Sequence, residues 1–210
     1  MRIIGKGIAL MMLAALFCAT LMAQDQDMPK KPPASRAVVN AKMPPPPQAS
    51  PEMTKLIQAM SGTWTVSEKY EQSPMFPTGG TGKGTAKLWA GPGGTSLLES
   101  YQSTNMMGKF SGFGTTWWDA KAQSYRGVWC DSMTPSGCDS SGSSKWDGET
   151  LAGMMESEMN GQKMVTKITY TNWTPNSFVM TMSTGPDANS LKDLMMVTYT
   201  KAAAAAKMGQ

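Results

Sequence analysis

Short segments in which apolar and polar side chains alternate follow one another between Gly62 and Lys201. Threonine, valine, aromatic residues and methionine dominate the segments, and clusters of glycine, proline, asparagine or aspartate separate them. Side chains of a β-strand point to alternate faces, so this period of two is typical of half-buried strands. The pattern predicts strands over residues 63–71, 81–90, 95–103, 107–118, 123–131, 140–147, 150–158, 163–172, 176–184 and 193–201.

No helical crossover separates these segments, so neighbouring strands are expected to be antiparallel and joined by turns. Turn residues stand at most of the junctions, and Asn160-Gly161 is the strongest hairpin signal among them. The expected fold class is therefore all-β, an antiparallel meander of about ten strands that closes, or nearly closes, into a barrel. A sandwich of two sheets is the competing architecture.

One short helix is expected just before the first strand. Ser50 is suited to the N-cap and Pro51 to the first helical turn, and Gly62 marks the end. Apolar residues recur between them at the spacing of one helical face: Met53, Leu56, Ile57 and Met60. An amphipathic helix of about ten residues should lie across the start of the barrel.

The two ends of the chain carry patterns that do not belong to the barrel. Residues 1–23 combine Arg2 and Lys6 with an apolar run that ends at Ala23, which is typical of a secretory signal peptide; a retained anchor is the alternative. Residues 24–50 are rich in proline and lack aromatic residues, so a disordered linker is expected. The predicted organisation is a signal peptide over 1–23, this linker over 24–50, the barrel over 51–201 and a flexible Ala-rich tail over 202–210.

The signal-like segment predicts that the protein is secreted or periplasmic. Its cleavage would remove Cys18 and leave Cys130 and Cys138 as an even pair in an oxidising compartment. Pro135 and Gly137 indicate a turn between the two cysteines. A disulfide here would hold the base of a hairpin loop, and two free thiols are the alternative. After cleavage of the signal peptide, no stable membrane span is expected.

The absence of histidine removes the commonest general base and the commonest zinc and haem ligand. Asp131 and Ser132 stand in a distinctive stretch, but a carboxylate at a strand end is better explained by hydrogen bonds to turn amides. A net charge of +4 without a basic stripe disfavours nucleic acid as a partner. We therefore expect neither catalytic activity nor a cofactor.

A barrel of about eight to ten strands is just wide enough to be filled by side chains or to hold one small ligand. Glycines near Trp117 and Trp129 leave room for a cavity there. The function expected is binding of a small apolar or amphipathic molecule inside the barrel. The alternative is a structural protein of the cell envelope with a filled barrel and no ligand. The residues expected to line the interior are Trp64, Tyr101, Phe113, Trp117, Trp129 and Phe178.

Methionine is unusually abundant, at 21 of 210 residues. Leucine and isoleucine are scarce in the predicted strands, so methionine is expected to supply apolar volume to the core. A Cu(I) site is the alternative, because Met180 and Met182 would present two thioethers on one face of a strand. A third sulfur, from Met164 or Met195, would be needed for useful affinity.

Several stretches of the chain resemble the exported bacterial proteins grouped as domain of unknown function 1579, which look like members of the lipocalin-like (calycin) superfamily. The resemblance covers roughly residues 52–201, and Trp129–Met133 is its most specific piece. The matching stretches are Gly62-Thr63-Trp64, GTTWWD (114–119), YRGVWCDSM (125–133), SSKWDG (143–148) and Val197–Lys201.

This resemblance implies a lipocalin-like barrel in an exported protein, without a known activity. In lipocalins the tryptophan of the Gly-x-Trp motif plugs one end of the barrel, and a basic residue of the last strand stacks on it. Trp64 matches that tryptophan, and Lys201 is the nearest candidate for the basic residue. An arginine of the family's late strand is not matched, since Thr166 and Lys167 stand there.

Overall fold

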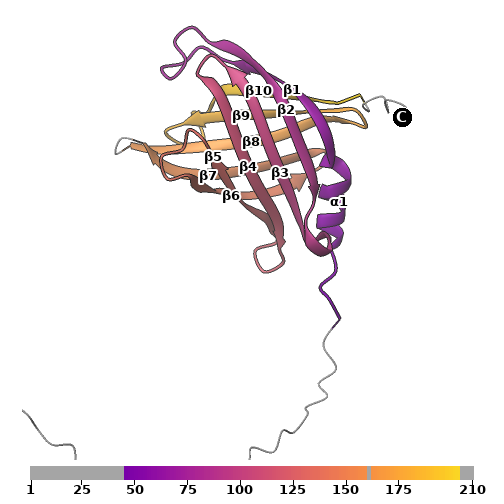
Figure 1. The fold of residues 1–210 in the computed structure, drawn as a ribbon. Helices are drawn as coiled ribbons and strands as arrows, with labels where there is room; N and C mark the ends of the chain where they lie inside the picture. Colours follow the sequence, from indigo (N-terminus) through magenta and orange to yellow (C-terminus); the bar gives the residue numbers. More distant parts are fainter. Residues whose placement is uncertain (1–44, 160–161, 204–210) are drawn as a thin grey trace, which may run out of the picture. The chain divides into compact units, whose positions relative to one another are not determined.

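The ten predicted strands are present, and they form a closed antiparallel barrel with one helix at its N-terminal side (Figure 1). The computed structural model describes residues 45–159 and 162–203. The predicted signal peptide, most of the predicted linker and tail, and the Asn160-Gly161 turn lie outside these residues. Within the described residues, no helix is long and apolar enough to cross a membrane.

The helix and strands begin and end within two residues of the positions that the sequence pattern predicts. A 3-10 turn, η1 (Pro92–Gly94), joins the second and third strands. The regular elements are α1 (Pro51–Met60), β1 (Gly62–Tyr70), β2 (Gly80–Ala90), β3 (Ser96–Asn105), β4 (Gly108–Asp119), β5 (Ser124–Asp131), β6 (Cys138–Asp147), β7 (Thr150–Met159), β8 (Gln162–Thr174), β9 (Ser177–Gly185) and β10 (Lys192–Lys201).

Each strand pairs with its neighbours in the chain, and β1 pairs with β10 to close the sheet. The closing register runs from Trp64 opposite Lys201 to Tyr70 opposite Met195. A sheet that closes on itself leaves no strand with a free edge. The sandwich alternative is therefore wrong, and the expectation of a closed barrel is confirmed.

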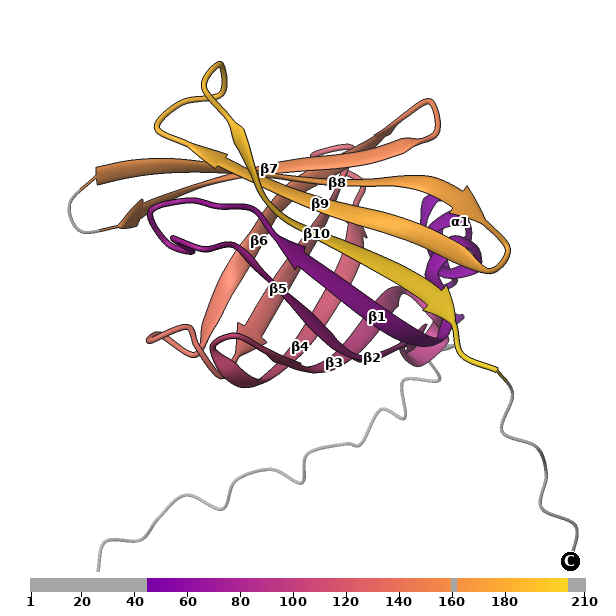
Figure 2. The same ribbon diagram turned by 90° about the horizontal axis from the view of Figure 1, so that it is seen from above.

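Helix α1 covers the end of the barrel at which β1 begins (Figure 2). Ser50 caps it, since its side chain accepts a hydrogen bond from the Met53 amide at 3.1 Å. Met53, Leu56 and Met60 are buried against the barrel core, as the apolar stripe predicts. The helix thus closes one end of the interior.

Trp64 forms the centre of this closed end. Its side chain is 1% exposed, and its indole nitrogen donates a hydrogen bond to the Met60 carbonyl at 3.0 Å. The Lys201 ammonium lies 4.8 Å from the centroid of the indole ring, which confirms the basic partner expected from the last strand. Phe178, which is fully buried, packs edge-on against Trp64 with 4.8 Å between ring centroids.

Truncation of Phe178 should be far more damaging than the same change on the outer face. Phe178→Ala should lower the free energy of unfolding by about 3–5 kcal/mol, because it opens a cavity in the core. Phe113→Ala removes a ring that is 45% exposed and should cost under about 1 kcal/mol. Urea unfolding of both variants measures the difference, and equal losses would contradict the packing described here.

Candidate functional site

The interior of the barrel is filled unevenly along its axis. Near α1 the inward side chains of several strands are buried, among them Leu88, Leu97, Tyr125 and Leu151. Farther from α1, the packing differs around the barrel. Glu68 and Tyr70 of β1 are buried, whereas inward-facing side chains of β5, β8, β9 and β10 keep part of their surface exposed. The partly exposed side chains are Trp129, Met164, Ile168, Met182 and Met195. The barrel is therefore closed at the α1 end and, on these four strands, less tightly packed toward the opposite end.

A glutamate is buried inside this apolar wall. Glu68 of β1 is 2% exposed, and it accepts hydrogen bonds from three neutral donors. The Tyr101 hydroxyl donates to Oε1 at 2.6 Å, and the Tyr70 hydroxyl donates to Oε2 at 2.8 Å. The Asn105 amide donates to Oε2 at 3.3 Å and also to the Tyr70 hydroxyl at 2.9 Å. These bonds satisfy the carboxylate oxygens without supplying a positive charge.

Glycine at position 82 makes this arrangement fit. Gly82 of β2 pairs with Glu68, and a Cβ atom there would overlap Glu68 Oε2 and approach Asn105 Cβ to 2.8 Å. Without a side chain on β2, the Glu68 carboxylate reaches across that strand to Tyr101 and Asn105 on β3. The polar cluster therefore joins β1 to β3 over a glycine.

The two tyrosines of this cluster remain hydrogen-bond donors. Burial raises the pKa of both the Tyr70 and the Tyr101 hydroxyl, and the hydrogen bond to the Glu68 carboxylate with its negative charge raises it further. Both hydroxyls therefore keep their protons well above neutral pH.

A second glutamate, Glu99 of β3, faces the interior and is only partly buried. The Tyr199 hydroxyl of β10 donates a long hydrogen bond to its Oε1 at 3.4 Å. Burial raises the pKa of Glu99 from 4.5 to about 7, and the bond from Tyr199 opposes the rise. Burial raises the pKa of Tyr170 and of Tyr199, and the negative charge of Glu99 raises both pKa values further.

One buried hydroxyl beside these carboxylates has no hydrogen-bond partner. Ser103 of β3 is 7% exposed, and its Oγ is unpaired although it lies between Tyr101 and Asn105 on the inward face. The other unpaired buried atoms of the described residues are Ser61 Oγ and Trp173 Nε1. Unsatisfied buried polar groups are uncommon in folded proteins, so Ser103 is an exception among the described residues.

Four of the six aromatic residues that were expected to line the interior do face inward. Trp64 and Phe178 belong to the packed end beneath α1. Tyr101 and Trp129 lie beside the acidic groups, with 6.4 Å between their ring centroids. The Trp129 ring lies over Gly112 and Gly114 of β4, where a Cβ atom would overlap it. The glycines were expected to leave room for a cavity near Trp117 and Trp129, and at Gly112 and Gly114 the Trp129 ring itself fills that room.

Phe113 and Trp117 face outward, and the expectation that they line the interior is wrong. They are 45% and 38% exposed. The inward positions of β4 are the even-numbered ones, because Gly112 and Gly114 must lie under the Trp129 ring. Phe113 and Trp117, at odd-numbered positions, consequently stand on the outer face.

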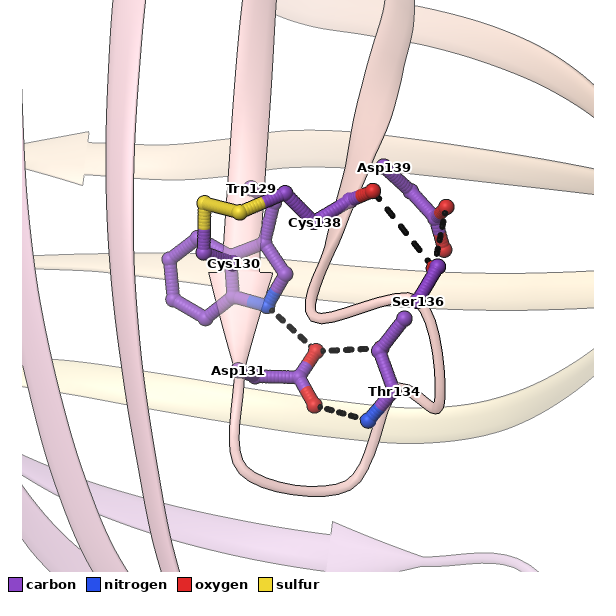
Figure 3. Close-up of a disulfide and its surroundings, with 7 residues drawn as sticks. All are labelled: Trp129, Cys130, Asp131, Thr134, Ser136, Cys138 and Asp139. Carbon is purple, nitrogen blue, oxygen red and sulfur yellow. Dashed lines mark hydrogen bonds between the residues drawn. A yellow bond between two sulfur atoms is a disulfide. The ribbon is translucent and has the colours of Figure 1, made fainter. Parts of the chain in front are cut away.

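Asp131 organises the loop after β5 (Figure 3). Its carboxylate accepts hydrogen bonds from the Met133 and Thr134 amides at 2.7 Å, the Thr134 hydroxyl at 2.8 Å and the Trp129 indole at 3.0 Å. The interpretation of Asp131 as a turn-stabilising residue is confirmed. Ser132 is exposed, and its hydroxyl accepts a hydrogen bond from the Ser111 amide at 3.2 Å.

A disulfide joins Cys130 and Cys138 at the base of the same loop (Figure 3). The two cysteines are directly opposed in the β5–β6 register. The expectation of a bridge is confirmed, and the alternative of two free thiols is wrong. The most specific part of the sequence resemblance, Trp129–Met133, therefore builds a braced loop at the end of the barrel opposite α1.

Met180 and Met182 both face the interior, as their spacing predicts. Met180 is 8% exposed, and Met182 is partly buried against the core. Met195 lies directly opposite Met182 on β10, so three thioethers share one face. Packing against the core agrees with methionine as core filler, and Cu(I) binding stays a prediction. Within the described residues, no group of three His, Cys, Asp or Glu side chains is arranged to hold a metal ion.

Two hollows on the barrel's surface do not contain the interior carboxylates. One of about 290 Å³ lies beside α1, where the Lys55 ammonium stands 4.0 Å from the centroid of the Trp146 ring. The other, of about 320 Å³, lies beside the disulfide loop and is lined in part by Asp131 and Ser132. Neither includes Glu68 or Glu99.

Sequence reasoning missed the polar interior. Glu68 and Glu99 interrupt the inward apolar positions of β1 and β3, between Val66 and Tyr70 and between Leu97 and Tyr101. A charged residue in phase with the apolar face of a strand is the signal that would have found both. The other groups of this site that the pattern did not indicate are Ser103, Asn105, Tyr170 and Tyr199.

The fold and site define a ten-stranded antiparallel barrel with a closed end, a braced loop at the opposite end and two inward carboxylates. The profile of the family described as protein of unknown function (DUF1579) matches residues 50–201, and the chain belongs to this family. No curated protein matches the sequence significantly.

Three solved structures are similar to this chain at low sequence identity. The crystal structure of Rv2717c from M. tuberculosis is 12% identical, with a TM-score of 0.50 over 74% of this chain and 100% of that one. This likeness shows the fold. The S-type phycobiliprotein lyase CPES from Guillardia theta is 9% identical, with a TM-score of 0.46 over 72% of this chain and 93% of that one. A de novo designed fluorescence-activating β-barrel is 12% identical, with a TM-score of 0.39 over 70% and 96%.

The raised pKa of Glu99 should make stability fall as the pH rises. Between its ordinary pKa of 4.5 and about 7, the folded chain keeps a proton that the unfolded chain has lost. The contribution of Glu99 is fully present below about pH 4.5 and is lost on going to pH 8, which costs about 3 kcal/mol. Glu99→Gln should remove this loss, as urea unfolding of both proteins at pH 5 and pH 8 would measure. Parallel pH profiles would contradict the burial of Glu99.

The disulfide should be complete in folded protein and should stabilise it. Alkylation of unreduced protein followed by mass measurement should find no free thiol at Cys130 or Cys138. Reduction should lower the free energy of unfolding by about 2–3 kcal/mol, because it restores chain entropy to the unfolded state. The Cys130→Ser, Cys138→Ser double variant should match reduced protein and should not respond to reductant. Two alkylated thiols in unreduced protein would refute the bridge.

Proposed function

We propose that the barrel binds a small amphipathic molecule in its interior, through the end opposite α1. The observation that carries the proposal is the uneven packing: inward side chains beneath α1 are buried, whereas Trp129, Met182 and Met195 keep exposed surface. A ligand would cover that surface and gain hydrophobic stabilisation.

The chemistry of the walls supports an amphipathic ligand over a purely apolar one. Aromatic rings and methionines form most of the partly exposed inner surface, and methionine adapts readily to the shape of a bound molecule. Glu99 adds a polar group at the same depth as the Tyr199 hydroxyl. Ligand pockets are generally apolar with a few placed polar groups, and this interior has that composition.

We further propose that the protein works outside the cytoplasm as a binding protein without catalytic activity. The Cys130–Cys138 disulfide supports this location, because such bonds persist in oxidising compartments. The signal-like sequence of residues 1–23 is consistent with export. Asp131, the carboxylate in the most distinctive motif, is fully engaged in holding its loop and is not arranged as a reacting group.

Nile red, a neutral dye that fluoresces in apolar surroundings, provides the test. Wild-type protein should bind it with enhanced emission. Met195→Trp should weaken binding at least tenfold, because the larger ring would occupy part of the interior beside Met182. Met196→Trp is the matched control: its side chain lies on the outer face and is 38% exposed, so binding should persist.

Two results would overturn the proposal. One is the absence of dye binding by wild-type protein, together with no co-purifying small molecule in native mass spectrometry of protein from its own host. The other is equal binding by the two tryptophan variants. Should Met195→Trp fail to fold, Met195→Ala replaces it, and its enlarged interior should change the dye affinity whereas Met196→Ala should not.

A further inference from the structure

We infer that the molecule bound in the interior is a small organic cation whose ammonium group pairs with Glu99. This inference rests on the proposed function and specifies the chemical class of the ligand. It is carried by two features of the interior: uncompensated negative charge and aromatic rings around Glu99.

The interior holds negative charge without a matching positive charge. Glu68 and Glu99 face inward, and no lysine or arginine of residues 45–159 and 162–203 forms an ion pair with either carboxylate. The chain as a whole carries a net charge of +4, so the acidic interior is a local feature. A buried carboxylate without a counter-charge is costly, and a bound cation would offset that cost.

The two carboxylates differ in availability. Glu68 accepts three hydrogen bonds and is 2% exposed, so its oxygens are already engaged. Glu99 accepts one long bond of 3.4 Å from Tyr199 and keeps part of its surface exposed. A carboxylate normally accepts several hydrogen bonds, so Glu99 has capacity for another donor. Glu99 is therefore the group that an entering ammonium would meet.

Aromatic rings surround Glu99 on the inward face. Tyr199 stacks on Phe178 at 4.3 Å and lies 6.4 Å from Tyr101, whose other neighbour is Trp129 at 6.4 Å. The charge of Glu99 also acts on Tyr170. Ring faces attract cations and contact the apolar body of an amine at the same time. Hard metal ions instead require about six or more oxygen ligands, which this wall of rings does not supply.

Three molecules that share a phenylpropyl body test the inference: 3-phenylpropylamine, 3-phenylpropanol and 3-phenylpropanoate, a cation, a neutral molecule and an anion. Their affinities for the wild-type chain are measured by calorimetry at pH 8, where Glu99 is ionised. The amine should bind at least tenfold more tightly than the alcohol, and the anion should bind most weakly. In Glu99→Gln the preference of amine over alcohol should fall to about threefold or less.

Glu156→Gln is the matched control, because it removes the same charge from an exposed side chain of β7 that pairs with Lys163 on the outer surface. It should keep the wild-type preference. Equal binding of amine and alcohol by wild-type protein would overturn the inference, as would equal loss of preference in both variants. Nile red binding without binding of any of the three probes would also overturn it and leave the proposed function standing. Absence of Nile red binding, together with no co-purifying small molecule, is the separate failure of the proposed function.

Discussion

The pairing of β1 with β10 is the constraint on which the rest of the barrel depends. It removes both free edges of the sheet, and its register sets which side chains of the first and last strands face inward. Trp64 comes to lie beside Lys201, and Glu68 and Tyr199 both point into the interior. A slip of one residue would turn all of these groups to the wrong face. The closed end and the acidic interior therefore depend on the same set of backbone hydrogen bonds.

Much of the fold is readable from the sequence because its determinants are local. Alternation, turn residues and the capping signals around α1 each act within a few residues. They predict the ends of every strand and of the helix to within two residues. The disulfide and the Lys201–Trp64 contact also follow from local spacing and from resemblance. The error at Phe113 and Trp117 has a different origin. Their face is decided by Trp129 on the next strand, whose ring requires glycines beneath it.

The candidate site was harder to predict, because it depends on contacts between strands. The Glu68 carboxylate reaches the Tyr101 hydroxyl only because Gly82, on the strand between them, has no side chain. Glu99 meets Tyr199 across the interior from a strand one hundred residues away. Acidic residues are denser in the sequence at Asp147, Glu149, Glu156 and Glu158, but these four side chains are all exposed. A glutamate at an inward position of a strand, such as Glu68 or Glu99, is a clearer sequence signal for a polar interior than a cluster of charged residues.

The first and last described residues lie at the same end of the barrel, and this has a consequence for how the barrel would be attached to another molecule. The Pro47 carbonyl lies beside Gly93 in the turn between β2 and β3, and the Ala202 amide donates a hydrogen bond to Thr63 at 2.9 Å. The described chain thus enters and leaves the barrel at the α1 end. A tether or fusion partner joined directly at residue 45 or residue 203 would attach the molecule at the end that α1 covers. The loop braced by the Cys130–Cys138 disulfide would then point away from the attachment, toward the surrounding solution.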